Sequence, residues 1–244
     1  MAERLASAGA RLALAALVAA TLAGCGEQSS REPAKAPAET SEAESKPPVA
    51  ALPEGKGFDF YVLSLSWSPT WCAENDAAGR TEQCRRGNRH GFIVHGLWPQ
   101  YDRGYPDFCP SRQPDRVPEA LGRSVMDIIP SMGLIGHQWR KHGTCSGLSQ
   151  KDYFAVTRAA RDRIVLPEAL EDAQTTQRTS PEDIEKSLIA ANPGLTQEGL
   201  AVTCRDGRLE EVRICLTRDL SFRECPEVDR DACRADSITR PPIR

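Results

Sequence analysis

The placement of nine cysteines constrains this 244-residue chain more than any other feature of its sequence. One of them, Cys25, stands alone near the N-terminus, and the others are spread between Cys72 and Cys233. Eight cysteines in one stretch of an exported chain are typical of a domain held together by disulfides in an oxidising compartment. Their spacing alone does not fix the pairing, because eight cysteines can pair in roughly 100 ways.

The N-terminus has the pattern of a bacterial export signal. Arg4 and Arg11 precede the apolar run Leu12–Leu22, which is too short for a transmembrane helix but suits the core of a signal peptide. The run ends in a Leu-Ala-Gly-Cys sequence that resembles a lipoprotein processing site. We therefore expect removal of residues 1–24 and lipidation of Cys25. An ordinary signal peptide cut nearby is the alternative.

The chain after the signal divides into a tether and a domain. Residues 25–57 are rich in Pro, Ala, Glu and Ser and lack aromatic residues, so they cannot bury enough apolar surface to fold. Residues 58–244 are long enough for one domain with its own core. We expect a monomeric periplasmic or cell-envelope protein, held to a membrane by a lipid on Cys25. A soluble periplasmic or secreted form is the alternative.

Local patterns in residues 58–244 predict both strands and helices. Phe58–Trp67 is rich in strand-forming residues, and Lys151–Ile164 has the pattern of a surface helix. Ser180, followed by proline, is a typical helix start, and an Asn-Pro-Gly sequence from Asn192 ends that helix. Asp206-Gly207 between two apolar stretches predicts a β-hairpin. These elements indicate an α+β domain.

All four histidines fall within the window 90–145. Imidazole is the side chain whose unperturbed pKa lies near neutrality, so histidines gathered in one window indicate proton transfer. In the first half of the window, Phe92–Val94 is a strand-forming run, and Gly96 and Pro99 are expected to prevent the strand from continuing past His95. His95 is then expected at the end of a buried strand.

The second half of the window predicts the last turns of a helix. His137 and Lys141 are four residues apart, as are Gln138 and His142, so each pair shares a helix face. Gly143 is expected to end the helix. The predicted helix end therefore presents two imidazoles, an amide and an ammonium group.

Two histidines on separate elements, together with a cation, suit one reaction well. A neutral imidazole can take a proton from a hydroxyl nucleophile, and a protonated one can give a proton to the leaving oxygen. A lysine and a third histidine can stabilise charge on a phosphoryl oxygen. Attack of a 2′-OH on its own phosphodiester needs these groups and no metal or cofactor. Because DNA lacks that hydroxyl, the expected substrate is RNA.

The two histidine segments resemble the active-site segments of the ribonuclease T2 family of secreted acid ribonucleases. His-Gly-Leu-Trp-Pro begins at His95, and His-Gln-Trp-Arg-Lys-His-Gly-Thr-Cys runs from His137 to Cys145. The resemblance extends from about Phe58 to the last cysteines. It implies a disulfide-stapled fold with a central antiparallel sheet and helices. It also implies a metal-independent endoribonuclease that cleaves single-stranded RNA through 2′,3′-cyclic phosphates.

The resemblance assigns a role to each of four side chains. It implies that His142 is the general base for the 2′-OH and that His95 is the acid for the 5′-oxygen. Lys141 would stabilise the pentacoordinate phosphoryl group, and His137 would help to bind the phosphate.

Three further positions belong to the expected site. The family pattern has Glu where this chain has Gln138, and an amide keeps the hydrogen bonding of a carboxyl group but cannot transfer a proton. By the same resemblance, Trp98 matches a tryptophan beside a base site, and Tyr105 lies roughly where relatives have a stacking tyrosine. Aromatic faces bind unstacked bases without demanding a sequence. Core packing is the alternative role of Trp98. The family pattern often has Asp where this chain has Gln100.

The family resemblance also implies how the cysteines pair. The implied disulfides are Cys109–Cys145, Cys204–Cys233 and Cys215–Cys225, and these leave Cys72–Cys84.

Other functions remain open on the sequence. The formal net charge of −3 argues against a protein that coats nucleic acid by bulk positive charge. A metal site could use His137, His142 and Cys145, although their spacing is not that of zinc proteases. A thiol hydrolase could use Cys145 with His142. The third alternative is an RNA-binding or interaction lipoprotein that has lost catalysis through Gln138.

Overall fold

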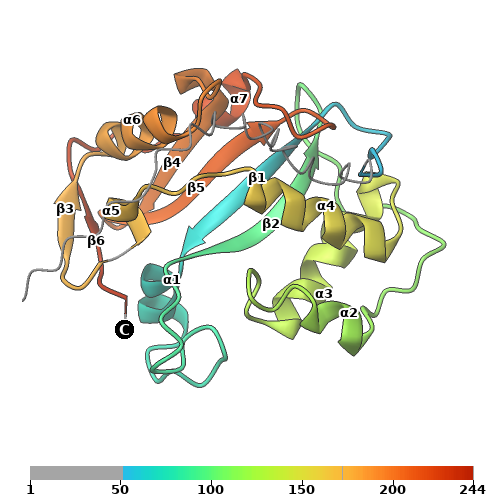
Figure 1. The fold of residues 1–244 in the computed structure, drawn as a ribbon, viewed down its shortest axis with the longest axis horizontal. Helices are drawn as coiled ribbons and strands as arrows, with labels where there is room; N and C mark the ends of the chain where they lie inside the picture. Colours follow the sequence, from blue (N-terminus) through green and yellow to red (C-terminus); the bar gives the residue numbers. More distant parts are fainter. Residues whose placement is uncertain (1–51, 172, 244) are drawn as a thin grey trace, which may run out of the picture. The chain divides into compact units, whose positions relative to one another are not determined.

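The structure, a computed structural model, describes residues 52–171 and 173–243 (Figure 1). The apolar run, Cys25 and almost all of the predicted tether lie outside the described residues. Within the described part of the chain, no helix is both long and apolar enough to cross a membrane. Close to its start, the backbone N–H of Lys56 donates a hydrogen bond to the carbonyl of Ser146, at 2.9 Å.

A six-stranded sheet forms the centre of the domain, in the order β2-β1-β5-β6-β3, with β4 pairing to β5. The pairings are antiparallel except for a short parallel contact between β5 and β6, so the sheet is mixed. The strands are β1 (Phe60–Trp67), β2 (Phe92–Gln100), β3 (Gln177–Thr179), β4 (Leu200–Arg205), β5 (Arg208–Leu216) and β6 (Ile238–Arg240).

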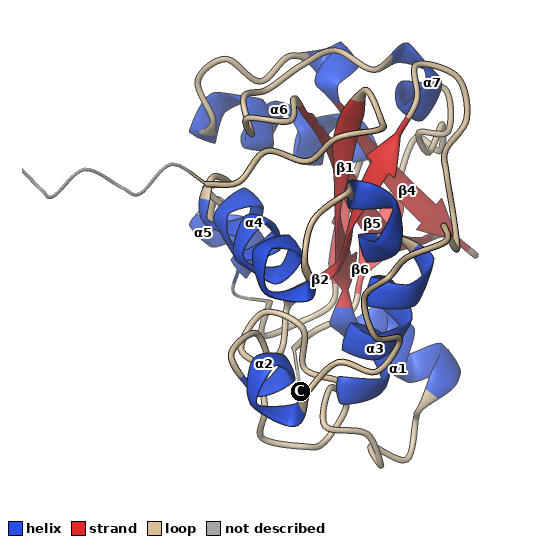
Figure 2. Ribbon diagram, turned by 90° about the vertical axis from the view of Figure 1, so that its right-hand side faces the viewer, coloured by secondary structure: helices blue, strands red, loops and turns tan. Residues whose placement is uncertain are grey.

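Helices lie on both sides of the sheet, which confirms the α+β class. Figure 2 shows α4 on one side of the strands and α7 on the other. The helices are α1 (Ser68–Asn75), α2 (Glu119–Arg123), α3 (Met132–Lys141), α4 (Gln150–Asp162), α5 (Glu168–Glu171), α6 (Pro181–Ala191) and α7 (Pro226–Asp229), and 3₁₀ turns span Gly143–Ser146 and Gln197–Gly199.

The central strand β1 is buried along its whole length, and its two faces differ. Side chains alternate across a strand, so Leu63, Leu65 and Trp67 share one face and lie in the main hydrophobic core. The opposite face begins with Phe60 and Val62, which belong to a smaller apolar cluster. Ser64 and Ser66 follow Val62 on that second face.

Several locally encoded elements are as predicted. The predicted surface helix is α4, and Ser149 caps it by accepting the N–H of Asp152 at 3.2 Å. α6 begins after Ser180, whose hydroxyl accepts the N–H of Asp183 at 3.0 Å. The hairpin between β4 and β5 turns through Asp206-Gly207, both at positive φ (48° and 71°), as a type I′ turn requires.

The prediction that the strand ends at His95 is wrong. β2 continues through Gly96 and Pro99 to Gln100. β2 is the edge strand of the sheet, so the missing N–H of a proline there need not remove a hydrogen bond to a neighbouring strand. His95 lies inside β2 as the extra residue of a β-bulge, because Ser64 pairs with Gly96 whereas the next residue of β1 pairs with Val94.

Four disulfides staple the domain. Cys109–Cys145 ties the long segment after β2 to the 3₁₀ turn that follows α3. The other three disulfides are Cys72–Cys84, Cys204–Cys233 and Cys215–Cys225, so the pairing is the one that the family resemblance implies. A domain stapled in this way is typical of an oxidising, extracytoplasmic compartment.

Candidate active site

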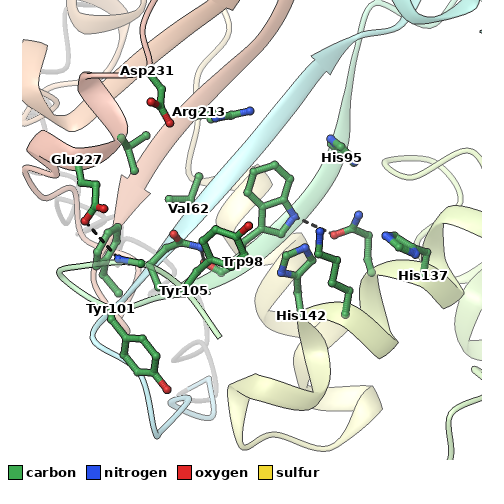
Figure 3. Close-up of a pocket in the computed structure, with 16 residues that line it drawn as sticks. Val62, His95, Trp98, Tyr101, Tyr105, His137, His142, Arg213, Glu227 and Asp231 are labelled. Atoms are coloured by element: carbon green, nitrogen blue, oxygen red, sulfur yellow. Dashed lines mark hydrogen bonds between the residues drawn. The ribbon is translucent and has the colours of Figure 1, made fainter. Parts of the chain in front are cut away.

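A cleft of about 410 Å³ opens over the second face of β1 (Figure 3). Its walls come from β1, β2 and the loop after it, α3, β5 and α7. All seven residues that the sequence predicts for the site line this cleft, namely His95, Trp98, Tyr105, His137, Gln138, Lys141 and His142. His90 is the one histidine outside it, and lines a separate cavity beside the Cys72–Cys84 disulfide.

The β-bulge explains how His95 and Trp98 share the cleft. Residues three apart point to opposite faces of a regular strand. Because His95 is itself the extra residue of the bulge, the alternation shifts by one position at His95, and its side chain faces the same side as that of Trp98. The local geometry of β2 therefore sets the spacing of the first histidine segment.

His95 is paired with a carboxylate that the sequence does not predict as part of the site. Its Nδ1 lies 2.5 Å from Oε1 of the buried Glu211 on β5, and the other carboxylate oxygen accepts the Nε–H of Arg213 at 3.0 Å. Burial raises the pKa of Glu211, but the hydrogen bond and charge of His95, together with Arg213, lower it to about 2. Glu211 is therefore ionised at neutral pH.

A sequence signal for this pair does exist. Glu211 and Arg213 are two residues apart in Leu209–Leu216, the second apolar stretch of the predicted hairpin, so opposite charges share one face of a strand whose other positions are largely apolar. The partner of Glu211 on β2 could not be found in the same way, because 116 residues separate the two.

His142 occupies a different environment from His95. It is the C-cap residue of α3 and is only 5% exposed. Burial, with the nearby charges of Lys141, His95 and His137, lowers the pKa of His142 to about 3. No described residue forms a hydrogen bond with its buried Nδ1. His142 is therefore a neutral imidazole at neutral pH, with a free nitrogen.

Trp98 connects the two histidine segments. Its Nε1–H donates to Oε1 of the buried Gln138 at 2.9 Å. Its ring stacks on His142, with ring centres 5.3 Å apart, and meets His95 edge to face, also at 5.3 Å. Trp98 is only half-buried, so it packs against the site and lines the cleft at once.

The contact between Gln138 and β2 depends on Gly96. A Cβ atom at this glycine would lie 2.0 Å from Oε1 of Gln138 and 2.3 Å from Nε1 of Trp98. Only a residue without a side chain lets α3 approach the strand this closely. The glycine expected to break the strand instead makes room for the amide.

His137 and Lys141 complete the cationic side of the cleft. His137 is exposed, with its ring edge against Phe108 at a centre distance of 6.3 Å. Partial burial, with the charges of Lys141 and Arg140, lowers the pKa of His137. Lys141 is half-buried one turn further along α3. α3 ends at Lys141 with His142 as its C-cap, one residue before the predicted end, and Gly143 begins a 3₁₀ turn.

Tyr105 lies toward the other end of the cleft and is 58% exposed. The loop that carries it is tied to the C-terminal segment at two points. Asp102 pairs with Arg223 at 3.0 Å, and the N–H of Gly104 donates to Glu227 of α7 at 3.3 Å (Figure 3). These contacts are not predicted by the sequence, because they join segments distant in the chain.

A second cleft of about 500 Å³ adjoins the first at the histidines. His95 and His137 line both clefts. The second cleft also includes Ser66, Trp71 and Leu134, from β1, α1 and α3. The site therefore has space on both sides of His95.

Two alternatives for Cys145 do not fit the structure. Its sulfur is bonded to Cys109, so it is neither a free metal ligand nor a free nucleophile. Within residues 52–171 and 173–243, no group of three or more His, Cys, Asp or Glu side chains is arranged to hold a metal ion.

Comparisons with known proteins agree with this geometry. The chain matches the Ribonuclease T2 family over residues 58–225. It is 37% identical over 175 residues to a ribonuclease of Aeromonas hydrophila, covering 70% of this chain and 77% of that protein. It is 33% identical over 179 residues to a probable ribonuclease of Haemophilus influenzae, covering 68% of this chain and 61% of that protein.

Solved structures share the fold. An RNase-related protein from Calystegia sepium superposes with a TM-score of 0.64 at 24% identity, covering 78% of this chain and all of that one. RNase NT, solved in complex with 5′-AMP, superposes with a TM-score of 0.60 at 22% identity, covering 77% of this chain and all of that one. With both histidine segments in one cleft and the family match across most of the domain, the chain belongs to the ribonuclease T2 family and is a ribonuclease of that family.

Proposed function

We propose that this protein is a metal-independent endoribonuclease that cleaves single-stranded RNA by transphosphorylation. The observation that carries the proposal is the contrast between its two cleft histidines. His142 is buried and neutral, whereas His95 is paired with the ionised Glu211, and both rings contact Trp98. Two titratable groups in environments this different suit opposite roles in acid–base catalysis.

The chemistry then follows from the two environments. Neutral His142 takes the proton of the 2′-OH as its oxygen bonds to phosphorus, and protonated His95 gives a proton to the 5′-oxygen as the P–O5′ bond breaks. The product is a 2′,3′-cyclic phosphate, which water opens with the two roles reversed. Lys141 and His137 stabilise the charge on the phosphoryl oxygens.

The aromatic residues of the cleft suit an unstacked base. The exposed Tyr105 offers a ring face, and the half-buried Trp98 adds an aromatic wall beside it; aromatic side chains bind bases without demanding a sequence. Since His95 and His137 line both clefts, the site has room for a nucleotide on either side of the scissile phosphate. RNase NT, which shares the fold, was solved with 5′-AMP, and this supports nucleotide binding here.

The proposed location follows from the N-terminal sequence and the disulfides. The protein is exported, loses residues 1–24, and is anchored to a membrane of the cell envelope by lipid on Cys25. Fractionation of cells that produce the native chain or Cys25→Ala tests this. The native protein is expected with the membranes, and Cys25→Ala in the soluble fraction. Equal fractionation of the two proteins would contradict the anchor.

Cleavage of single-stranded RNA in EDTA tests the activity, with the chain from Gly26 onward. His95→Ala and His142→Ala are each expected to lose at least about 100-fold in rate, because each removes one partner of the acid–base pair. His90→Ala, which removes a histidine outside the cleft, is the matched control and should keep full activity. The products should carry 2′,3′-cyclic ends.

Other outcomes separate the alternatives. RNA binding by the native chain without any cleavage would mean that the fold serves binding rather than catalysis. Cleavage that EDTA abolishes would mean a metal nuclease. Full activity in His142→Ala would refute the two-histidine mechanism.

A further inference from the structure

The second cleft, which His95 also lines, contains the buried carboxylate of Glu211, for which the proposed mechanism has no direct use. Glu211 contacts His95 and Arg213, and no step of the proposed mechanism is assigned to it. We propose that Glu211, braced by Arg213, is a positioning residue that holds His95 in the tautomer whose Nε2 faces the cleft. Its consequence for catalysis rests on the proposed function, but the tautomer itself does not.

The sheet is built so that Glu211 can reach His95. β1 lies between β5, which carries the glutamate, and β2, which carries the histidine. Neighbouring strands are about 4.8 Å apart, so the two side chains must meet across a third strand. On this face β1 presents Ser64 and Ser66, whose small side chains leave the path open. Ser66 pairs directly with Glu211.

The size of Ser64 matters more than its hydroxyl. Ser64 is fully buried and pairs with Arg213 on one side and Gly96 on the other. No described residue forms a hydrogen bond with its Oγ. A buried hydroxyl without a partner costs free energy, so bonding by Ser64 does not explain its presence. The small size of Ser64, which leaves space for Glu211 to reach His95 across β1, does explain it.

Both oxygens of Glu211 are occupied. Oε1 lies 2.5 Å from Nδ1 of His95, and Oε2 accepts the Nε–H of Arg213 at 3.0 Å. The guanidinium group of Arg213 in turn lies over the ring of Trp98, 5.6 Å from its centre. The carboxylate therefore cannot rotate away from His95 without losing a charge-assisted hydrogen bond.

The chemical consequence concerns which imidazole nitrogen acts. An ionised carboxylate can only accept, so Nδ1 of His95 must carry the proton in this contact. Nε2 is then the nitrogen left for the cleft. When His95 is protonated, Nε2–H is the donor available to the leaving oxygen, and the carboxylate stabilises the imidazolium ion.

Nitrogen NMR of His95 in the chain from Gly26 onward tests the tautomer without RNA. The His95 signals are assigned by their loss in His95→Ala. In the native chain at a pH where His95 is neutral, the proton is expected on Nδ1. In Glu211→Ala it should shift mainly to Nε2. In Glu211→Gln both forms are expected, because one amide oxygen cannot serve His95 and Arg213 together.

Kinetics supply the second measurement. Glu211→Ala is expected to lower kcat about 10- to 100-fold with little change in KM, a typical effect for a residue that orients another. Glu182→Gln, on the exposed face of α6, is the control and should change neither quantity. Melting temperatures identify a variant that fails to fold, and Glu211→Gln then carries the test.

Failure of the role proposed for Glu211 can be told apart from failure of the proposed ribonuclease activity. Loss of the Nδ1–H tautomer in Glu211→Ala, in a protein that cleaves no RNA, would support the positioning of His95 and refute the proposed activity. RNA cleavage with an unchanged tautomer and an unchanged kcat in Glu211→Ala would overturn this inference alone.

Discussion

At position 138 the chain carries an amide where the family pattern has a carboxylic acid, and the structure shows what that amide binds. Oε1 of Gln138 accepts the Nε1–H of Trp98. A carboxylate would accept the same hydrogen bond, so the glutamine preserves the contact that holds Trp98 against His142. What differs is the charge: position 138 carries no negative charge at the end of α3, where burial and Lys141 already disfavour protonation of His142.

Gln138→Glu should therefore raise the pKa of His142, because a nearby negative charge favours the imidazolium form. A general base works unprotonated, so its activity is lost as the pH falls through its pKa. The acid limb of kcat/KM is expected to move to higher pH in the variant. Gln177→Glu makes the same change on an exposed residue of β3 and should leave the profile in place. An unmoved acid limb in Gln138→Glu would show that position 138 does not act on the base.

At the scale of the element, local and non-local determinants explain what the sequence could predict. The surface helix α4, the Ser180 cap of α6 and the turn at Asp206-Gly207 depend on neighbouring residues, so the sequence predicts them correctly. The end of α3 is predicted to within one residue, although Gly143 continues into a 3₁₀ turn. The contact between His95 and Glu211 depends on the order of three strands, which no local pattern contains.

β2 shows the limit most clearly. Gly96 and Pro99 are residues that break strands in isolation, yet both lie within β2. Pro99 is tolerated because β2 is at the edge of the sheet. Gly96 is needed because α3 packs so closely that a Cβ atom at this position would clash with Gln138. The family resemblance names the side chains of the site, but only the register of β1 and β2 shows that a bulge brings His95 and Trp98 to one face.

Gly96→Ala tests the close approach of α3 to β2. Its Cβ would meet Gln138 and Trp98, so the hydrogen bond between them is expected to break and the stacking of Trp98 on His142 to loosen. We expect a loss of about 10-fold or more in kcat/KM, with a shift of tryptophan fluorescence, because small displacements of catalytic groups have large effects on rate. Activity and emission at the native level in Gly96→Ala would mean that the amide contact is not needed.

Gly136→Ala on α3 is the matched control for that change. The nearest atom that its Cβ would meet is the end of the flexible Arg140 side chain, at 3.1 Å. Alanine is a better helix former than glycine by about 1 kcal/mol, so this variant should be as stable as the native chain or more stable, with unchanged activity. Comparing Gly96→Ala with Gly136→Ala separates the effect of adding a methyl group from the effect of the position at which it is added.

For the whole molecule, the site and the stability of the fold are coupled through burial. The domain encloses His142 between Trp98 and the disulfide-braced end of α3. An imidazole that is 5% exposed and has no carboxylate partner among the described residues resists protonation in the folded state. The unfolded chain has no such restriction. The arrangement that keeps the proposed base neutral therefore makes the fold sensitive to acid.

The direction in which pH changes the free energy of unfolding follows from the two pKa values of His142, about 6.5 in the unfolded chain and about 3 in the folded protein. A histidine with a lowered folded pKa contributes its full stability above the unfolded pKa and loses it as the pH falls toward the folded one. Between pH 7 and pH 5 the unfolded chain gains a proton at this position and the folded protein does not. The native free energy of unfolding should fall by about 2 kcal/mol from this group alone.

His142→Asn removes this titration, and urea unfolding at pH 7 and pH 5 with the disulfides intact measures the result. The variant is expected to lose about 2 kcal/mol less than the native protein between the two pH values, whatever its stability at pH 7. His90→Asn is the control, because His90 is less buried and its loss should change the pH dependence less. Identical pH dependence in the native protein and His142→Asn would mean that His142 titrates normally in the fold, and the neutral base would then need another origin.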